Sequence, residues 1–134
     1  MTQVAAALLV LPDGKVVLQR RTKDARISPG KLGFFGGHVE LGETVAVAVK
    51  REIGEETSLE VRRLNFEHIA VFSLSAKVTG NEDVEFHVFR VEIPNSDFAV
   101  YEGDRLEIYG INEALARNDI TASTRHVLTS IKEN

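Results

Sequence analysis

Three glutamates lie within five positions of one another, at 52, 55 and 56. If this segment is helical, residues three and four positions apart share one face, so the three carboxylates would lie side by side. Like charges at that spacing destabilise a helix by about 0.2–0.5 kcal/mol per pair. A divalent cation would offset the repulsion, because Mg²⁺ binds carboxylate oxygens and keeps positions open for water and phosphate. The spacing therefore predicts a magnesium site that includes Glu52, Glu55 and Glu56.

Two features upstream would complete such a site. Gly36 and Gly37 let the backbone approach an ion closely and offer it a carbonyl oxygen, because no side chain stands in the way. Glu43 precedes Arg51 by about two helical turns, and we expect the two to form an ion pair if the chain entering the helix folds back over it. This pair would orient the glutamates without taking part in the chemistry.

The segment from Gly37 to Leu59 resembles the Nudix box, G-x5-E-x7-R-E-U-x-E-E-x-G-U, in which U is a bulky aliphatic residue. Ser58 stands where the box has its second glycine. Eight of the nine fixed positions match: Gly37, Glu43, Arg51, Glu52, Ile53, Glu55, Glu56 and Leu59. A match of this length at fixed spacing favours the box over the alternative, an acidic helix face exposed to solvent.

The resemblance implies a Mg²⁺-dependent hydrolase in which water attacks phosphorus and cuts a diphosphate linked to another group, commonly a nucleoside. It implies Glu52, Glu55 and Glu56 as metal ligands together with the Gly37 carbonyl, and it allows Mn²⁺ in place of Mg²⁺. Metal ions suit this chemistry because they lower the pKa of bound water and neutralise phosphate oxygens. Glu52 is the first candidate for orienting or deprotonating the attacking water, although this role varies within the family.

A second resemblance lies at Glu102-Gly103, which is similar to the acidic loop that many MutT-like members carry before the C-terminal helix. In those members the loop glutamate acts as a further metal ligand or base, so the resemblance implies the same role for Glu102. The alternative is a turn glutamate exposed to solvent, because this dipeptide is common in turns.

Three residues are candidates for substrate contacts: Arg21, Phe35 and His38. Arg21 ends an expected strand where related proteins often place an arginine near the phosphates, and a solvated strand end is the alternative. Phe34 or Phe35 would stack on a base, and core packing is the other interpretation. His38 neighbours the predicted metal loop, and the histidines show no spacing typical of a zinc site.

The substrate class follows from markers that the chain lacks. The segment Leu74-Ser75-Ala76-Lys77 lies where members acting on ADP-ribose often carry a proline and members acting on dinucleoside polyphosphates a tyrosine. We therefore expect a nucleoside triphosphate or another nucleoside diphosphate derivative, with a modified purine nucleoside triphosphate first. The alternative is a Nudix-fold module that binds a nucleotide or nucleotide sugar without cutting it. The intact box glutamates and Arg51 favour the enzyme.

Composition limits the possible classes of protein, cellular locations and partners. With 43% apolar and 27% charged residues, the chain is typical of a soluble globular protein, and its length predicts one domain over residues 1–134. The absence of cysteine excludes disulfides, zinc–thiolate sites and cysteine nucleophiles, and it fits a cytoplasmic location. The net charge of −4 and the lack of a basic stripe argue against polymeric nucleic acid as a partner. The apolar run from Val4 to Leu11 is too short for a membrane span or signal peptide. A homodimer stays open.

Hydrophobic patterns predict the elements that must position these residues. Pro12-Asp13-Gly14 predicts a hairpin turn, and the segment from Thr44 to Thr57 is expected to be a helix, although its alternating valines also fit a strand. Asn112 and Thr121 are expected to cap two C-terminal helices. The expected strands are Val4 to Leu11, Lys15 to Gln19, Leu59 to Leu64, Ala70 to Val78 and Val84 to Ile93. This order favours an α/β fold, a mixed sheet covered on both faces, in agreement with the α/β/α sandwich and loop-helix-loop box that the resemblance implies.

Ser58 provides a test of the predicted helix end. In the family the glycine at this position ends the helix, where a left-handed backbone is favourable only without a Cβ. If Ser58 adopts that conformation, its replacement by glycine is expected to stabilise the protein slightly.

Overall fold

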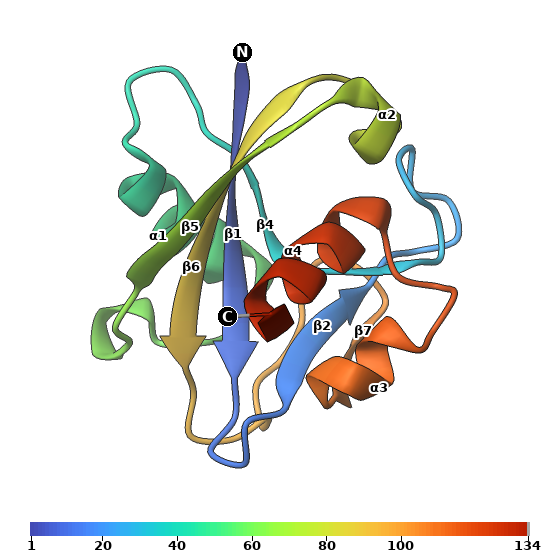
Figure 1. Ribbon diagram of the computed structural model, residues 1–134. Helices are drawn as coiled ribbons and strands as arrows, with labels where there is room; N and C mark the ends of the chain where they lie inside the picture. Colours follow the sequence, from blue (N-terminus) through green and yellow to red (C-terminus); the bar gives the residue numbers. More distant parts are fainter. Residues whose placement is uncertain (134) are drawn as a thin grey trace.

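A mixed β-sheet lies at the centre of the fold, with helices on both of its faces (Figure 1). The computed structural model describes residues 1–133, so residue 134 of the predicted domain lies outside the described part. The strands are β1 (Thr2–Val10), β2 (Val16–Arg20), β3 (Leu32–Gly33), β4 (Phe35–His38), β5 (Glu67–Leu74), β6 (Val84–Glu92) and β7 (Arg105–Tyr109). The helices are α1 (Val45–Glu56), the 3₁₀-helix η1 (Val61–Arg63), α2 (Ala76–Thr79), α3 (Ile111–Leu115) and α4 (Ala122–Glu133).

Strand β1 is the central strand and pairs with three others. It runs parallel to β6 along its whole length, from Thr2 opposite Val84 to Val10 opposite Glu92, and antiparallel to β2 and β4. The β1–β2 hairpin confirms the turn predicted at residues 12–14, where Gly14 has φ +87° and donates its N–H to the Leu11 carbonyl. Because β4 pairs with β1, the glycine pair of the predicted metal loop is held against the centre of the sheet.

Alternate residues of β1 face opposite layers of the core. Ala5, Ala7 and Leu9 pack towards α1, in a cluster that contains Val49 and Ile53. The intervening β1 residues, Ala6, Leu8 and Val10, pack with Val127 and Leu128 of α4. Figure 1 shows α1 behind the sheet and α4 in front of it. Each buried valine or leucine contributes about 1.5–3 kcal/mol relative to an exposed one, so both helices are held firmly to the sheet. The predicted α/β sandwich is confirmed.

The helix predicted from Thr44 to Thr57 is confirmed as α1. The Thr44 hydroxyl accepts a hydrogen bond from the Val47 N–H at 3.1 Å, which caps the first turn. The alternating valines do not form a strand, because a helical register buries Val49 with Ile53 and leaves Val47 exposed. Of the two structures that the sequence pattern allowed, helix and strand, the segment adopts the helix.

One strand prediction is wrong, and another has shifted bounds. The segment from Leu59 to Leu64 is not a strand but contains η1, and it buries its aliphatic residues against the α1 side of the core without a partner strand. The strand predicted from Ala70 to Val78 is β5, which begins at Glu67 and ends at Leu74. The strand ends before the predicted position because α2 follows at once. The Asp83 carboxylate stabilises the start of α2 by accepting a hydrogen bond from the Ala76 N–H at 2.7 Å.

The two C-terminal helix starts differ in outcome. Thr121 caps α4 as predicted, because its hydroxyl accepts a hydrogen bond from the Thr124 N–H at 3.2 Å. Asn112 was the wrong cap for α3. That helix is preceded by Gly110, whose N–H donates to the Glu113 carboxylate at 2.9 Å.

The end of α1 differs from the expected glycine-type cap. Thr57 follows the helix with φ −140° and ψ 166°, an extended conformation, and Ser58 is absent from the residues with positive φ among those described. The backbone N–H of Ser58 donates to the Ala99 carbonyl at 3.0 Å, and the Ser58 hydroxyl accepts a hydrogen bond from the Ala99 N–H at 2.8 Å. Serine is therefore suited to this position, and the condition for the predicted gain from glycine, a positive φ, is not met.

We expect Ser58→Gly to lower the melting temperature. The variant loses the hydroxyl bond to Ala99 and gains unfolded-state entropy, which together destabilise by about 1 kcal/mol at this exposed position. Thermal denaturation followed by circular dichroism measures the change. Ser58→Ala is the matched control, because it removes only the hydroxyl, and its melting temperature should fall between the other two. A glycine variant that melts above the parent would contradict the extended helix end.

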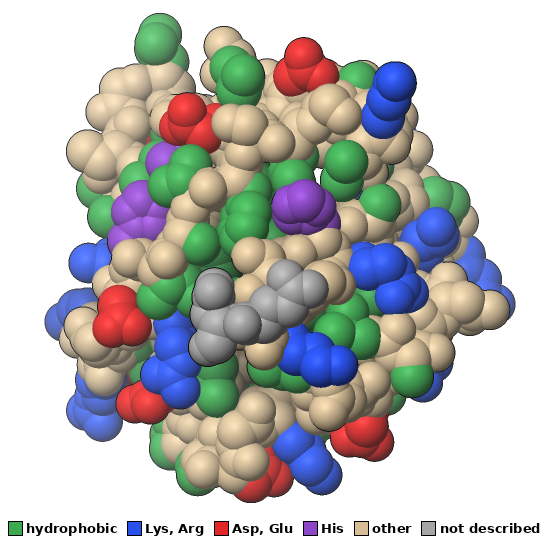
Figure 2. Space-filling view, in the orientation of Figure 1, with side chains coloured by type: hydrophobic (Ala, Val, Ile, Leu, Met, Phe, Trp, Pro, Cys, Tyr) green, Lys and Arg blue, Asp and Glu red, His purple; other side chains and the backbone are tan. Residues whose placement is uncertain are grey.

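Charged side chains are mixed over the surface that carries α4. Figure 2 shows Lys and Arg side chains spread over this face with Asp and Glu side chains among them. Proteins that follow a nucleic-acid backbone instead gather basic residues into a groove or stripe.

Among residues 1–133, no helix has both the length and the apolar character needed to cross a lipid bilayer.

Candidate active site

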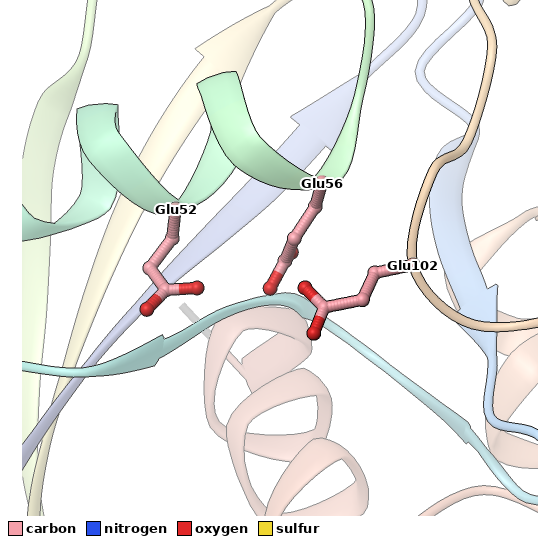
Figure 3. Close-up of side chains that lie close together, drawn as sticks. All are labelled: Glu52, Glu56 and Glu102. Carbon is pink, nitrogen blue, oxygen red and sulfur yellow. The ribbon is translucent and has the colours of Figure 1, made fainter.

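Three carboxylates converge in front of the glycine pair. Glu52 and Glu56 project from the same face of α1, and Glu102 reaches them from the loop before β7 (Figure 3). One carboxylate oxygen from each residue lies within 4.8 Å of the other two. The structure thus brings together two of the three predicted helix glutamates and the predicted loop glutamate.

Arg51 holds the glutamate face from the side. Its guanidinium donates two hydrogen bonds to the Glu43 carboxylate, at 2.6 and 3.0 Å, and one to the Glu52 carboxylate at 3.0 Å. It also donates to the His38 carbonyl at 3.1 Å, which ties the end of β4 to the helix. The Glu43–Arg51 ion pair expected from the sequence is present in the structure, and the bidentate geometry fixes both side chains.

Glu55 lies outside the three-carboxylate cluster. Its carboxylate accepts a hydrogen bond from Arg51 at 2.7 Å, and its side chain is 54% exposed. Glu55 shares a helix face with the cluster, but its carboxylate turns towards the positively charged guanidinium of Arg51. Its predicted role as a metal ligand stays a prediction.

The two glycines are required by close contacts. A Cβ on Gly36, where φ is +141°, would lie 2.3 Å from the Ala5 carbonyl oxygen. A Cβ on Gly37 would lie 2.6 Å from the carboxyl carbon of Glu52. Any larger residue at Gly37 would therefore displace Glu52 from the cluster.

Glu56 is the most buried member of the cluster, with 5% of its surface exposed. Burial raises its pKa well above the usual range for a glutamate, and the hydrogen bond and negative charge of Glu52 act in the same direction. The Gly36 N–H donates to the Glu56 carboxylate at 3.0 Å and lowers the pKa, but it is the weaker influence. Burial and the neighbouring charge therefore favour the protonated form of Glu56 when no cation is bound.

The donor atoms of the cluster fit a hard divalent cation. All three side chains offer carboxylate oxygens, which Mg²⁺ and Mn²⁺ prefer, and Glu52 and Glu56 are held in place by the surrounding structure. A bound cation would remove the mutual repulsion and would displace the proton from Glu56. The cluster thus has the chemistry of a metal site.

Two adjoining cavities extend from the cluster. The first, of about 420 Å³, is lined by the cluster together with Gln19, Thr22, Glu40 and Gly103. The second, of about 470 Å³, lies between β4, α2 and the start of α4. Both are lined by Arg21, Gly36, Gly37 and His38, so these residues form their common border. Each has the volume of a small-molecule site.

Comparison with known proteins identifies the family, because residues 1–130 match the family model described as NUDIX domain. The chain belongs to the Nudix family. The MutT protein of Methanosarcina mazei Go1 has the same fold, with a TM-score of 0.81 and 23% sequence identity over 98% of this chain and 93% of that protein. At that identity the likeness concerns the fold alone.

Two curated relatives share parts of the Nudix domain. The Xenopus laevis m7GpppN-mRNA hydrolase NUDT17 is 39% identical over 70 residues, which are 52% of this chain and 24% of the frog protein. The Danio rerio oxidized purine nucleoside triphosphate hydrolase is 28% identical over 107 residues, which are 79% of this chain and 60% of the zebrafish protein. The chain therefore spans less than two thirds of either relative.

The residues predicted to contact substrate lie in different parts of the Nudix domain. Arg21 and His38 both lie at the border of the two cavities, and the Arg21 Nε donates to the Ile27 carbonyl at 2.7 Å. Phe35 is fully buried in the α1 side of the core, which favours core packing, the other interpretation of this residue, over stacking on a base. Phe34 lies on the opposite side, where it lines the larger cavity and packs 6.3 Å from the Phe86 ring.

Sequence reasoning missed most of the larger cavity. Its walls include Asn81 and Glu82 from the loop after α2 and Thr124 from the start of α4. No motif marks these positions. Gln19 was also missed, although a polar residue within the apolar strand Val16-Val17-Leu18-Gln19 was a usable signal, because buried polar groups need a specific partner.

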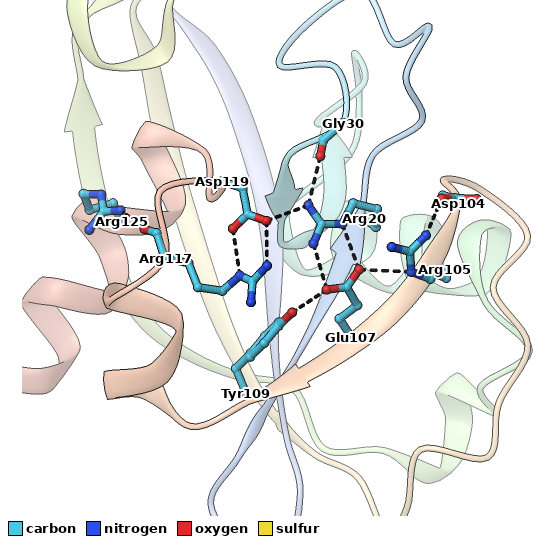
Figure 4. A network of polar contacts seen from close by, with 9 residues as sticks. All are labelled: Arg20, Gly30, Asp104, Arg105, Glu107, Tyr109, Arg117, Asp119 and Arg125. Atoms are coloured by element: carbon cyan, nitrogen blue, oxygen red, sulfur yellow. Dashed lines mark hydrogen bonds and ion pairs between the residues drawn. The ribbon is translucent and has the colours of Figure 1, made fainter.

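A partly buried ion-pair network flanks the site (Figure 4). The Arg20 guanidinium donates two hydrogen bonds to the Glu107 carboxylate, both at 2.8 Å, one to Asp119 at 3.0 Å and one to the Gly30 carbonyl at 3.0 Å. Arg117 also pairs with Asp119, at 2.8 Å. Arg20 therefore joins β7, the segment before α4 and the loop that ends at β3. Those last two segments also contribute residues to the larger cavity.

Proposed function

We propose that this Nudix domain is a Mg²⁺-dependent pyrophosphohydrolase that cuts nucleoside triphosphates to a monophosphate and pyrophosphate. The observation that supports this proposal is the continuity of two unlike cavities. One carries the carboxylate cluster of Glu52, Glu56 and Glu102, and the other carries the apolar wall of Phe34 and Phe86. A nucleotide bound across their border would have its phosphates at the carboxylates and its base beside Phe34.

The carboxylates would hold the cation. Glu52, Glu56 and Glu102 would supply oxygen ligands, and Gly37, whose Cα side faces the Glu52 carboxylate, would supply its carbonyl oxygen as another. Bound Mg²⁺ would neutralise the diphosphate oxygens and lower the pKa of the attacking water. Mn²⁺ is expected to substitute, because its ligand preferences are similar.

The remaining residues would bind and orient the substrate. Arg21 lies at the border of both cavities, where its guanidinium would bind a phosphate oxygen after exchanging its bond to the Ile27 carbonyl. Glu52 accepts a hydrogen bond from Arg51, which fixes its side chain, and it is our candidate for orienting the attacking water. Phe34 would pack against the base, and His38 at the same border would contact the sugar or phosphates.

A modified purine nucleoside triphosphate is the first candidate substrate. The zebrafish relative is named for hydrolysis of oxidised purine nucleoside triphosphates, and it matches 79% of this chain. The larger cavity offers both an apolar wall and polar side chains such as Asn81 and Thr124 that could read the edge of a base. The cytoplasmic location and the homodimer also stay predictions.

A competition assay tests the substrate class. Oxidised and ordinary purine nucleoside triphosphates, ADP-ribose and a nucleotide sugar are mixed with the protein and Mg²⁺, and the products are separated by chromatography. We expect the triphosphates to disappear first, the oxidised purine fastest, with monophosphate and pyrophosphate as products and no reaction in the presence of a chelator. Loss of ADP-ribose or the nucleotide sugar alone would overturn the substrate proposal. Binding without turnover of any compound would favour the non-catalytic module.

A further inference from the structure

Gln19 is a buried amide at the end of β2, next to the carboxylate cluster. Only 7% of its surface is exposed, and it lines the smaller cavity together with the three glutamates. Its Nε2 donates a hydrogen bond of 2.7 Å to the backbone carbonyl of Glu102. Burying a polar side chain without a hydrogen-bond partner costs free energy, so the folded protein maintains the bond between Gln19 and Glu102. The bond therefore fixes the position of both residues.

The loop also packs closely against the Gln19 side chain. Gly103 has φ +87°, and a Cβ there would lie 2.8 Å from the Gln19 Cγ. The loop can therefore approach the amide only because Gly103 has no side chain. The Glu102-Gly103 dipeptide, which the sequence offers as a metal loop, is shaped to fit Gln19.

The flanking residues of the loop are anchored on two different elements. The Tyr101 N–H donates to the Glu56 carbonyl at 2.7 Å, which ties the loop to the end of α1. The Asp104 N–H donates to the Arg20 carbonyl at 2.8 Å, which ties it to β2. Between these anchors, the Gln19 amide fixes the peptide of Glu102 itself.

Such an anchor is needed because Glu102 is exposed and faces two other carboxylates. Like charges at this distance repel, and an exposed glutamate on a freely moving loop would turn towards solvent before a cation arrives. A fixed backbone limits this movement and holds the carboxylate near the position in which it can bind a cation.

We propose that Gln19 is a positioning residue that acts through Glu102 and raises the affinity of the carboxylate cluster for a divalent cation. The inference rests on the proposed function in one respect, the role of Glu102 as a metal ligand. It does not depend on the identity of the substrate. Gln19 lies outside the Nudix box and carries no charge.

Direct Mn²⁺ binding to the full chain tests this role. Free Mn²⁺ is measured by electron paramagnetic resonance in titrations of the parent, Gln19→Met, Glu102→Gln and the double variant. Methionine keeps the length of the side chain but cannot donate the hydrogen bond. We expect Gln19→Met to weaken Mn²⁺ binding about tenfold, the low end for loss of an outer-sphere partner. In the Glu102→Gln background the same change should alter affinity by less than about twofold, because both residues act on one ligand.

Gln3→Met is the matched control. Gln3 is also a partly buried strand glutamine whose amide donates to an acidic residue, Glu85, at 2.8 Å, but it does not line the smaller cavity. Its substitution should leave Mn²⁺ affinity unchanged. Melting temperatures of both variants check that each remains folded under the conditions of the titration.

The outcomes separate this inference from the proposed function. Parent-like Mn²⁺ affinity in Gln19→Met, or an equal loss in the parent and Glu102→Gln backgrounds, overturns the inference, since Gln19 would then not act through Glu102. Parent-like affinity in Glu102→Gln removes Glu102 from the metal site and overturns it as well. If the parent binds Mn²⁺ with the expected pattern among the variants but cleaves no nucleotide, the inference stands and the proposed function fails.

Discussion

Replacing Glu56 by glutamine is expected to lower Mg²⁺-dependent hydrolysis at least about a hundredfold, the low end for loss of a positioned catalytic group. Glutamine keeps the shape of the side chain and can still accept the hydrogen bond that the Gly36 N–H donates, but it carries no charge for a cation. Steady-state rates on the best substrate of the competition assay, measured over a range of Mg²⁺ concentrations, give the size of the effect.

The fold of this variant should be preserved. Burial raises the pKa of Glu56 and so favours its neutral form in the metal-free protein, which glutamine resembles in shape and charge. The loss of activity can therefore be separated from unfolding by comparing melting temperatures in the presence of a chelator. Near-normal turnover of Glu56→Gln would remove the carboxylate cluster from the proposed mechanism.

Glu55→Gln is the matched control, one residue away on the same helix. The Glu55 side chain lies outside the cluster and pairs with Arg51, so its substitution should cost far less activity than that of Glu56. A loss as large as that of Glu56→Gln would show instead that Glu55 turns towards the cation when one is bound, as the sequence alone predicts. The pair of variants thus decides which glutamates are ligands.

The sequence predicted the helix glutamates because their spacing is local. Thr44 capped α1, Ile53 faced the core, and a helical period of 3.6 placed Glu52 and Glu56 on one face. The same reasoning placed Glu55 with them, since spacing does not describe how an arginine on that helix competes for a carboxylate. Glu102 was found only through resemblance, because it approaches from a loop that is distant in sequence.

Contacts between distant segments were the part that the sequence could not reveal. Phe34 and Phe35 are adjacent and chemically alike, and only the register of β4 on β1 determines which of them enters the core. The end of α1 was predicted with a left-handed residue, whereas pairing of Ser58 with Ala99 favours extended backbone. In both cases tertiary pairing outweighed a local preference.

The ion pair between Arg20 and Glu107 is expected to contribute strongly to stability. The side chains of Arg20 and Glu107 are 12% and 15% exposed, so removal of one partner leaves the other charge largely desolvated. Breaking a fully buried ion pair typically costs about 3–5 kcal/mol, which sets the upper range for this partly buried one. We expect Glu107→Gln to destabilise by about 3 kcal/mol, at the low end of this range, because Asp119 still pairs with Arg20.

This destabilisation corresponds to a fall of about 10 °C in melting temperature for a domain of this size. Glu92→Gln is the matched control, because Glu92 also pairs with an arginine but its side chain is 76% exposed, where ion pairs contribute about 0–1 kcal/mol. Calorimetry of both variants and the parent measures the difference. Equal melting temperatures for Glu107→Gln and the parent would show that the network contributes little.

The pH dependence of stability gives an independent reading of the same contact. The hydrogen bonds from Arg20 lower the pKa of Glu107 from 4.5 to about 2. Between these two values the unfolded chain binds a proton that the folded protein does not, so the contribution of Glu107 to stability is complete above about pH 4.5 and is lost as the pH falls towards 2. The difference in melting temperature between the parent and Glu107→Gln should therefore be largest near neutral pH and shrink in acid. A difference that stays constant from pH 7 to about pH 3 would mean that glutamine acts by disturbing packing and not by removing the charge.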